Sequence, residues 1–156
     1  MSSILNSIVL QSFIMKDYKE KIQKVLSDYD FIVNTVVFGS YANSKMGEFS
    51  DIDMAIETSR EVGILELGGI ISNLETCTNK KIDLVLLNSL YKHRPLLAYN
   101  IYINHKIIFI KDMQRYNDFK INALHYYMDF KYILDEQNKA FRQRVANGNI
   151  GKTKTA

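Results

Sequence analysis

Apolar residues recur along the chain with two different periods, which predict helices and strands in alternation. Residues 3–29 carry apolar side chains every three or four positions, as on one face of a helix. Four shorter apolar runs rich in β-branched residues are typical of strands: 31–38, 52–57, 81–87 and 106–110. Helical spacing returns between these runs, at 40–47, 64–76 and 96–103. The alternation predicts an α/β (α+β) fold, in which a mixed β-sheet carries flanking helices.

The helical periods also predict which side chains face the core. In the first helix the inward set is Ile4, Ile8, Met15, Tyr18, Ile22, Val25 and Tyr29. In the helix at 64–76 it is Ile64, Leu67, Ile71 and Leu74. The helix at 96–103 follows Pro95, a residue that suits the first turn of a helix.

A long last helix is predicted at about 115–146, and it carries two apolar stripes. The first stripe is Tyr116, Phe119, Ala123, Tyr127, Phe130 and Leu134. The second, roughly 130° around the helix at about 100° per residue, is Ile121, Leu124, Met128 and Tyr132. One stripe serves the helix's own core, so the second implies burial on another side. Either two parts of one domain enclose the helix, or the second stripe docks a protein partner. We favour a partner, with Leu124, Met128 and Tyr132 as interface residues.

Length and composition fit one compact domain. The chain has 156 residues, of which 47% are hydrophobic and 24% charged, as is ordinary for a soluble globule. We expect a single domain over 1–147, including the docking helix, and a disordered tail over 148–156.

Net charge, cysteine content and the lack of a long apolar run indicate which partners and which cellular compartment to expect. The net charge of +3 is too small to indicate nucleic-acid binding. The basic residues after Glu136 are best explained as a solvated tail; the functional alternative is a contact with an acidic partner or with RNA, and the case for RNA is thin. A single cysteine excludes an internal disulfide, and we find neither a convincing signal peptide nor a membrane span. We therefore expect a cytoplasmic protein.

The segment Gly39-Ser40, ten intervening residues, then Asp51-Ile52-Asp53 carries the candidate chemistry. Residues i and i+2 of a strand point to one face, so Asp51 and Asp53 can converge on one site. Adjacent carboxylates repel unless one is protonated or a cation lies between them, and Mg²⁺ prefers oxygen ligands. Gly39 removes a Cβ that would block a phosphate, while the Ser40 hydroxyl and nearby backbone N–H groups can bind phosphate oxygens. The pattern indicates metal-dependent phosphoryl or nucleotidyl transfer.

A third carboxylate, Asp83, is the one charge inside the apolar run at 81–87. If this run is a buried strand beside the one at 52–57, Asp83 joins the pair. It can then bind a metal and accept the proton of an attacking hydroxyl. The alternative for Asp83 is a structural salt bridge to Lys80 or Lys81.

The Gly39-Ser40 and Asp51-x-Asp53 signature resembles that of the DNA polymerase β-type nucleotidyltransferase superfamily, over about residues 30–88. The resemblance implies a nucleotidyltransferase fold. It also implies that Gly39 and Ser40 hold the triphosphate of ATP, and that Asp51, Asp53 and Asp83 hold two Mg²⁺ ions. Relatives often have an arginine shortly after the Gly-Ser; position 43 here is Asn, and Lys45 is the candidate replacement.

Chain length and the early position of the motif are similar to those of the minimal nucleotidyltransferases. The C-terminal segments 126–131 and 140–148 are similar to the tail of the MntA-type antitoxins. This second resemblance implies an antitoxin that transfers AMP from ATP to a tyrosine of a HEPN-domain toxin and so silences its RNase activity. It also implies a hetero-oligomer with that toxin. Two alternatives stay open: a nucleotidyltransferase of the antibiotic-modifying kind that acts on small molecules, and an antitoxin that neutralises by binding alone.

Overall fold

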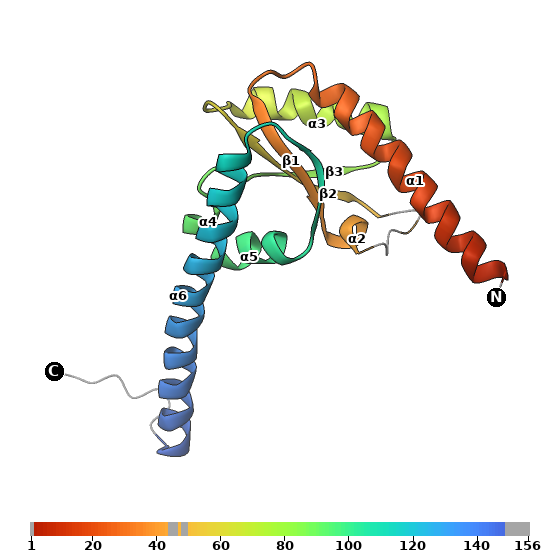
Figure 1. Cartoon of the computed structure of the whole chain (residues 1–156). Helices are drawn as coiled ribbons and strands as arrows, with labels where there is room; N and C mark the ends of the chain where they lie inside the picture. The colour runs from red at the N-terminus through yellow and green to blue at the C-terminus, as the bar shows by residue number, and fades with distance from the viewer. Residues whose placement is uncertain (1, 44–46, 48–49, 149–156) are drawn as a thin grey trace.

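The computed structural model describes residues 2–43, 47 and 50–148. Lys45 and the tail from residue 149 lie outside this part of the chain, so the predictions made for them stay predictions. The elements follow the order predicted from the sequence, with one helix added (Figure 1).

A four-stranded mixed sheet forms the centre of the fold, with the strand order β3-β2-β1-β4. Strand β1 (Ile32–Phe38) lies between β2 (Ile52–Thr58) and β4 (His105–Ile110), and both pairings are antiparallel. Strand β3 (Ile82–Leu86) pairs parallel to β2 at one edge. The central strands are nearly continuous apolar runs because helices cover both of their faces. The predicted mixed α/β sheet is confirmed.

Helices lie on both faces of the sheet (Figure 1). One face carries α1 (Ser2–Leu26) and α3 (Ile64–Thr78). The other carries the short helices α4 (Leu90–His93) and α5 (Pro95–Ile103) and the start of α6 (Met113–Ala146). Pro95 is the first residue of α5, as expected, because its missing N–H is not needed in the first turn.

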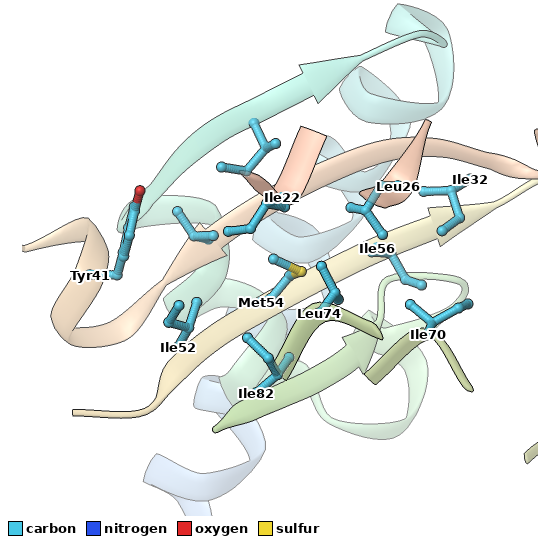
Figure 2. Packing of buried hydrophobic residues seen from close by; sticks show 12 residues of the cluster. Ile22, Leu26, Ile32, Tyr41, Ile52, Met54, Ile56, Ile70, Leu74 and Ile82 are labelled. Atoms are coloured by element: carbon cyan, nitrogen blue, oxygen red, sulfur yellow. The ribbon is translucent and has the colours of Figure 1, made fainter. Parts of the chain in front are cut away.

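Each face has its own hydrophobic core. Figure 2 shows the core under α1 and α3, where Ile22 and Leu26 of α1 and Leu74 of α3 pack on Met54 and Ile56 of β2. The core under α4, α5 and α6 is built from alternate residues of the same strands. Its buried members include Val36, Ala55, Leu87, Ala98, Ile101, Tyr116, Phe119 and Ala123. The period of two along each strand thus divides its residues between the two cores.

Two element predictions need correction. The helix expected at 40–47 is only α2 (Gly39–Ala42), which ends where Asn43 N–H donates to the Gly39 carbonyl at 3.2 Å. Helix α4 was not predicted, since its four residues are too few for a helical period to show.

Some apolar residues expected in the core are exposed. Ile64 is 85% exposed, and Ile70, which was not predicted, takes the buried position in α3. Ile4 and Ile8 are 66% and 59% exposed, because the N-terminal half of α1 extends beyond the sheet (Figure 1). Met15, Tyr18, Ile22 and Val25 do pack on the core, as predicted.

Helix α6 also extends away from the rest of the molecule (Figure 1). Only Tyr116, Phe119 and Ala123, in its first third, are buried. In the second stripe Ile121, Met128 and Tyr132 are 55%, 60% and 69% exposed. The alternative in which two parts of one domain enclose this helix is therefore wrong for the described residues. Docking of a partner on this stripe stays a prediction.

Candidate functional site

The turn between β1 and α2 has the backbone conformation that its glycine predicts. Gly39 has φ +63°, in the left-handed region that side chains other than glycine rarely adopt. A Cβ atom placed on Gly39 would overlap the Oδ2 atom of Asp53. Glycine therefore has two functions here, since it permits the turn and lets the Asp53 carboxylate lie against the backbone.

Strand pairing brings the Gly39-Ser40 turn and two acids into one row across the sheet. The Cα of Phe38, immediately before Gly39, pairs with Asp53 across β1 and β2. Asp53 in turn pairs with Asp83 across the parallel β2 and β3. The predicted neighbour relation between the two acidic strands is thus confirmed.

The two acids share the sheet face that carries α5 and α6. Ala55 and Val85, each two residues after one of these acids, both pack in the core on that face. The site therefore opens on the α5 side of the sheet. Asp51 directly precedes the first residue of β2. It lies at the same end of this strand as Asp53 and is exposed.

Electrostatics mark Asp53 as the central acid. Burial raises the pKa of the Asp53 carboxyl above its usual value, and the negative charges of Asp83 and Asp51 raise it further. The charges of both neighbouring aspartates therefore act on Asp53. A cation bound between them would remove this repulsion.

Asp83 is less buried than its sequence context suggests. It is exposed, because β3 is an edge strand, so the expectation of a buried acid was wrong. The alternative role for Asp83 was a salt bridge to Lys80 or Lys81. For Lys81 the structure shows a different partner. The ammonium of Lys81 lies 4.0 Å from Asp51 Oδ2 instead, and both side chains are half-exposed or more. Such an exposed pair contributes little to stability.

The acids fit a magnesium site by their chemistry. Three carboxylates, one with a raised pKa, are hard oxygen donors of the kind that Mg²⁺ prefers. Among the described residues, however, no three Asp, Glu, His or Cys side chains lie close enough together to hold a single ion. Assignment of Asp51, Asp53 and Asp83 as metal ligands therefore remains a proposal.

Two hydrogen-bonded groups, one beside the turn and one at the opposite end of β2, were not predicted from the sequence. His105 pairs with Phe38 on the side opposite Asp53, and its Nδ1 lies 2.8 Å from the Ile101 carbonyl. Since Nδ1–H must donate there, Nε2 accepts the hydrogen bond from the Tyr116 hydroxyl at 2.7 Å. This network joins α5 and α6 to the strand end at Phe38. A single histidine at a strand start gives no signal that would reveal it.

The other missed group is Glu57, which is 8% exposed at the far end of β2. The Asn34 side-chain amide donates to Glu57 Oε2 at 2.7 Å and also bonds the backbone of Asp112, before α6. The period of two from Asp53 could have shown that Glu57 faces inward. This network anchors the start of α6.

Comparison with known proteins identifies the family. The family model described as polymerase beta nucleotidyltransferase matches residues 20–114, more than half of the chain. The chain belongs to this nucleotidyltransferase family. Two similar proteins of Methanocaldococcus jannaschii carry the name of candidate protein adenylyltransferases. Each is 30% identical over 87 residues, which is 56% of this chain and 87% of the relative.

Solved structures share the nucleotidyltransferase fold. A chain of a toxin–antitoxin complex with AMP-PNP superposes with a TM-score of 0.62 and 20% identity, over 81% of this chain and 98% of its own. A chain of a complex between a tri-AMPylated HEPN toxin and an MNT antitoxin, from Shewanella oneidensis, also gives 0.62 at 20% identity. That match covers 85% of this chain and 98% of the other. The predicted fold is confirmed.

Within residues 2–43 and 50–148, no helix combines the length and the apolar character needed to cross a bilayer.

Proposed function

We propose that this nucleotidyltransferase is an antitoxin that transfers AMP from ATP to a tyrosine hydroxyl of a partner HEPN-domain toxin. The observation that carries the proposal is the row Phe38, Asp53 and Asp83, with Gly39 at its end in the left-handed conformation. Relatives named as protein adenylyltransferases, and fold neighbours in toxin–antitoxin complexes, support a protein as the acceptor.

The reaction is in-line displacement at the α-phosphate. The tyrosine oxygen forms a bond to the α-phosphorus, the bond to the bridging oxygen breaks, and pyrophosphate leaves. Asp83, exposed beside Asp53, takes the tyrosine proton. Gly39 and Ser40 hold the β- and γ-phosphates at the turn. Asp51, Asp53 and Asp83 would hold Mg²⁺, and the ion would supply positive charge against the phosphate oxygens.

The exposed stripe on α6 is the proposed docking surface for the toxin. Met128 and Tyr132 are exposed on a helix that extends from the molecule, and Leu124 is half-buried beside them. Large apolar and aromatic side chains of this kind are typical anchors of protein interfaces. Because this surface on α6 lies away from the candidate site acids, a toxin docked on it would leave those acids free to meet the toxin's tyrosine.

Two alternatives differ in what they require of the acids. A binding-only antitoxin needs the α6 surface but not Asp51, Asp53 or Asp83. A nucleotidyltransferase for small molecules needs the acids but no toxin. The test uses the protein encoded by the adjacent gene, which this proposal requires to be a HEPN-domain toxin.

The test is RNA cleavage by the toxin after incubation with this chain, ATP and Mg²⁺, followed by separation of the two proteins. We expect the separated toxin to stay inactive only when ATP was present, and to stay active after incubation with the variant Asp51→Asn/Asp53→Asn. Neutralisation that needs the continued presence of this chain and is unchanged in the variant supports binding alone. No neutralisation and no complex support a small-molecule acceptor.

A further inference from the structure

A pocket lies on the face of the sheet opposite the candidate site acids, between α1, α2 and β4. Its volume is about 430 Å³, within the range of about 300–1,000 Å³ typical of small-molecule sites. Its apolar surface comes from Ile8 and Met15 of α1, Ile107 and Ile108 of β4, and the ring of Tyr41. Nothing in the proposed reaction uses it.

One face of α1 forms the long wall of this pocket. The lining residues of α1 are spaced as one helical face, from Ile8 through Gln11, Ser12 and Met15 to Lys19. The opposite wall is the edge strand β4. Tyr41 also lines the pocket, and its hydroxyl donates to the Met15 carbonyl at 2.6 Å. The pocket is therefore built by three separate elements and held by a hydrogen bond between two of them.

The charge around the pocket has one sign. Lys16 and Lys19 of α1 and Lys106 of β4 line it, and no Asp or Glu occurs among the described residues that do so. On α1, Asp17 points elsewhere and pairs with Lys21 at 2.8 Å. An apolar interior with ammonium groups around it is complementary to a molecule with an apolar body and an anionic head.

We infer that this pocket binds an organic anion with an apolar body, of the size of a medium-chain carboxylate or an aryl sulfonate. The volume favours a small molecule over a protein helix, and the lysines favour an acidic head group. The occupant would contact Tyr41, which follows Ser40 directly, so binding is placed to alter the phosphate-binding turn. This regulatory consequence rests on the proposed function, but the binding itself does not.

The experiment is a fluorescence titration of the full chain with 1-anilinonaphthalene-8-sulfonate, followed by displacement with decanoate. We expect saturable binding at one site, which decanoate reverses and acetate at the same concentration does not. Affinity for the dye should fall at least tenfold in Lys16→Glu/Lys19→Glu and in Ile8→Glu. All three positions are exposed, so circular dichroism should show unchanged helix content.

Matched controls separate the pocket from net charge and from general hydrophobic surface. Lys24→Glu/Lys131→Glu makes the same charge change at exposed positions away from the pocket, and Phe13→Glu changes another exposed face of α1. Both controls should keep affinity within twofold. An absence of saturable binding, or equal losses in the controls, would overturn the inference. Because no nucleotide transfer enters this titration, its failure leaves the proposed function standing, and the reverse also holds.

Discussion

At the scale of single residues, the site depends on the contact between Gly39 and Asp53. The turn needs a positive φ at Gly39, and the Asp53 carboxylate occupies the space where a side chain would begin. The same carboxylate has a pKa raised by burial and by two neighbouring acids. Backbone conformation and charge are thus concentrated at one point, where a triphosphate and a metal ion would meet.

The first prediction concerns Gly39→Ala. We expect this variant to lose nucleotidyl transfer and about 1–2 kcal/mol of stability, because alanine is strained at φ +63° and its Cβ displaces Asp53. Urea unfolding and a transfer assay measure the two effects. Gly68→Ala is the matched control, since it lies in α3 with no atom near the added Cβ. It should keep full activity and gain about 0.5–1 kcal/mol. Normal transfer by Gly39→Ala would refute this account of the turn.

The second prediction concerns the buried acid Glu57. Burial raises its pKa, although the hydrogen bond from Asn34 opposes the shift. The folded state therefore holds the proton more tightly than the unfolded state, and the contribution of Glu57 to stability falls as pH rises from its unfolded pKa through its folded pKa.

Glu57→Gln should remove this fall, so its stability relative to the parent should be higher at pH 8 than at pH 5. Urea unfolding at both pH values checks it, with the exposed Glu61→Gln as control. If Glu57→Gln loses more stability at pH 8 than at pH 5, the charged carboxylate is stabilising, and attraction to Arg115 outweighs burial.

The sequence was informative at Gly39 and Asp53 because a local motif specifies both the turn and the strand after it. It was misleading at Asp83, where an apolar run suggested burial but the strand lies at the sheet edge. Whether a strand lies at the edge or in the centre of a sheet depends on which strands pair with it. Pairing joins segments that are far apart in the sequence, so a local pattern does not show it. For the same reason, the hydrogen bond from Asn34 to Glu57 had no local signal.

At the scale of elements, α6 has two roles along its length. Its first third packs on the sheet through Tyr116, Phe119 and Ala123, and Asp112 caps its first turn by accepting from Arg115 N–H at 3.0 Å. Further along, the rings of Tyr99 in α5 and Tyr127 in α6 stack with centroids 3.7 Å apart. Beyond this stack the helix has apolar side chains but no described element to cover them. Helix period predicted both stripes, but only the structure shows that the fold buries the first stripe as far as Ala123 and leaves its members Phe130 and Leu134 exposed.

The third prediction tests the exposed stripe on α6. Met128→Ala and Tyr132→Ala should each leave stability within about 0.5 kcal/mol, since both side chains are exposed. Each should weaken the complex with the HEPN toxin by about 2 kcal/mol if it is an anchor, or roughly thirtyfold in Kd. Calorimetric titration measures this. Gln137→Ala, on the opposite face of α6, is the control and should bind normally. A loss of folding with unchanged affinity would assign the stripe to the core instead.

At the scale of the whole molecule, the sheet divides its tasks between two faces and one edge. The acids lie on the face of α5 and α6, the apolar pocket with its three lysines lies on the face of α1, and Gly39 and Ser40 lie between them at the end of β1. Alternating helix and strand patterns were enough to predict this class of fold. They could not show that α1 and α6 extend beyond the sheet (Figure 1). The period of a helix shows that it has an apolar face, but it does not show what covers that face.

The most direct test of the central claim is the intact mass of the HEPN toxin after incubation with this chain, ATP and Mg²⁺. The account predicts that the toxin gains mass in whole steps of one AMP residue. It also predicts no gain with Asp51→Asn/Asp53→Asn, and no gain when the acceptor tyrosine is changed to phenylalanine. An unchanged toxin mass, under conditions where the complex forms, would contradict the assignment as a protein adenylyltransferase.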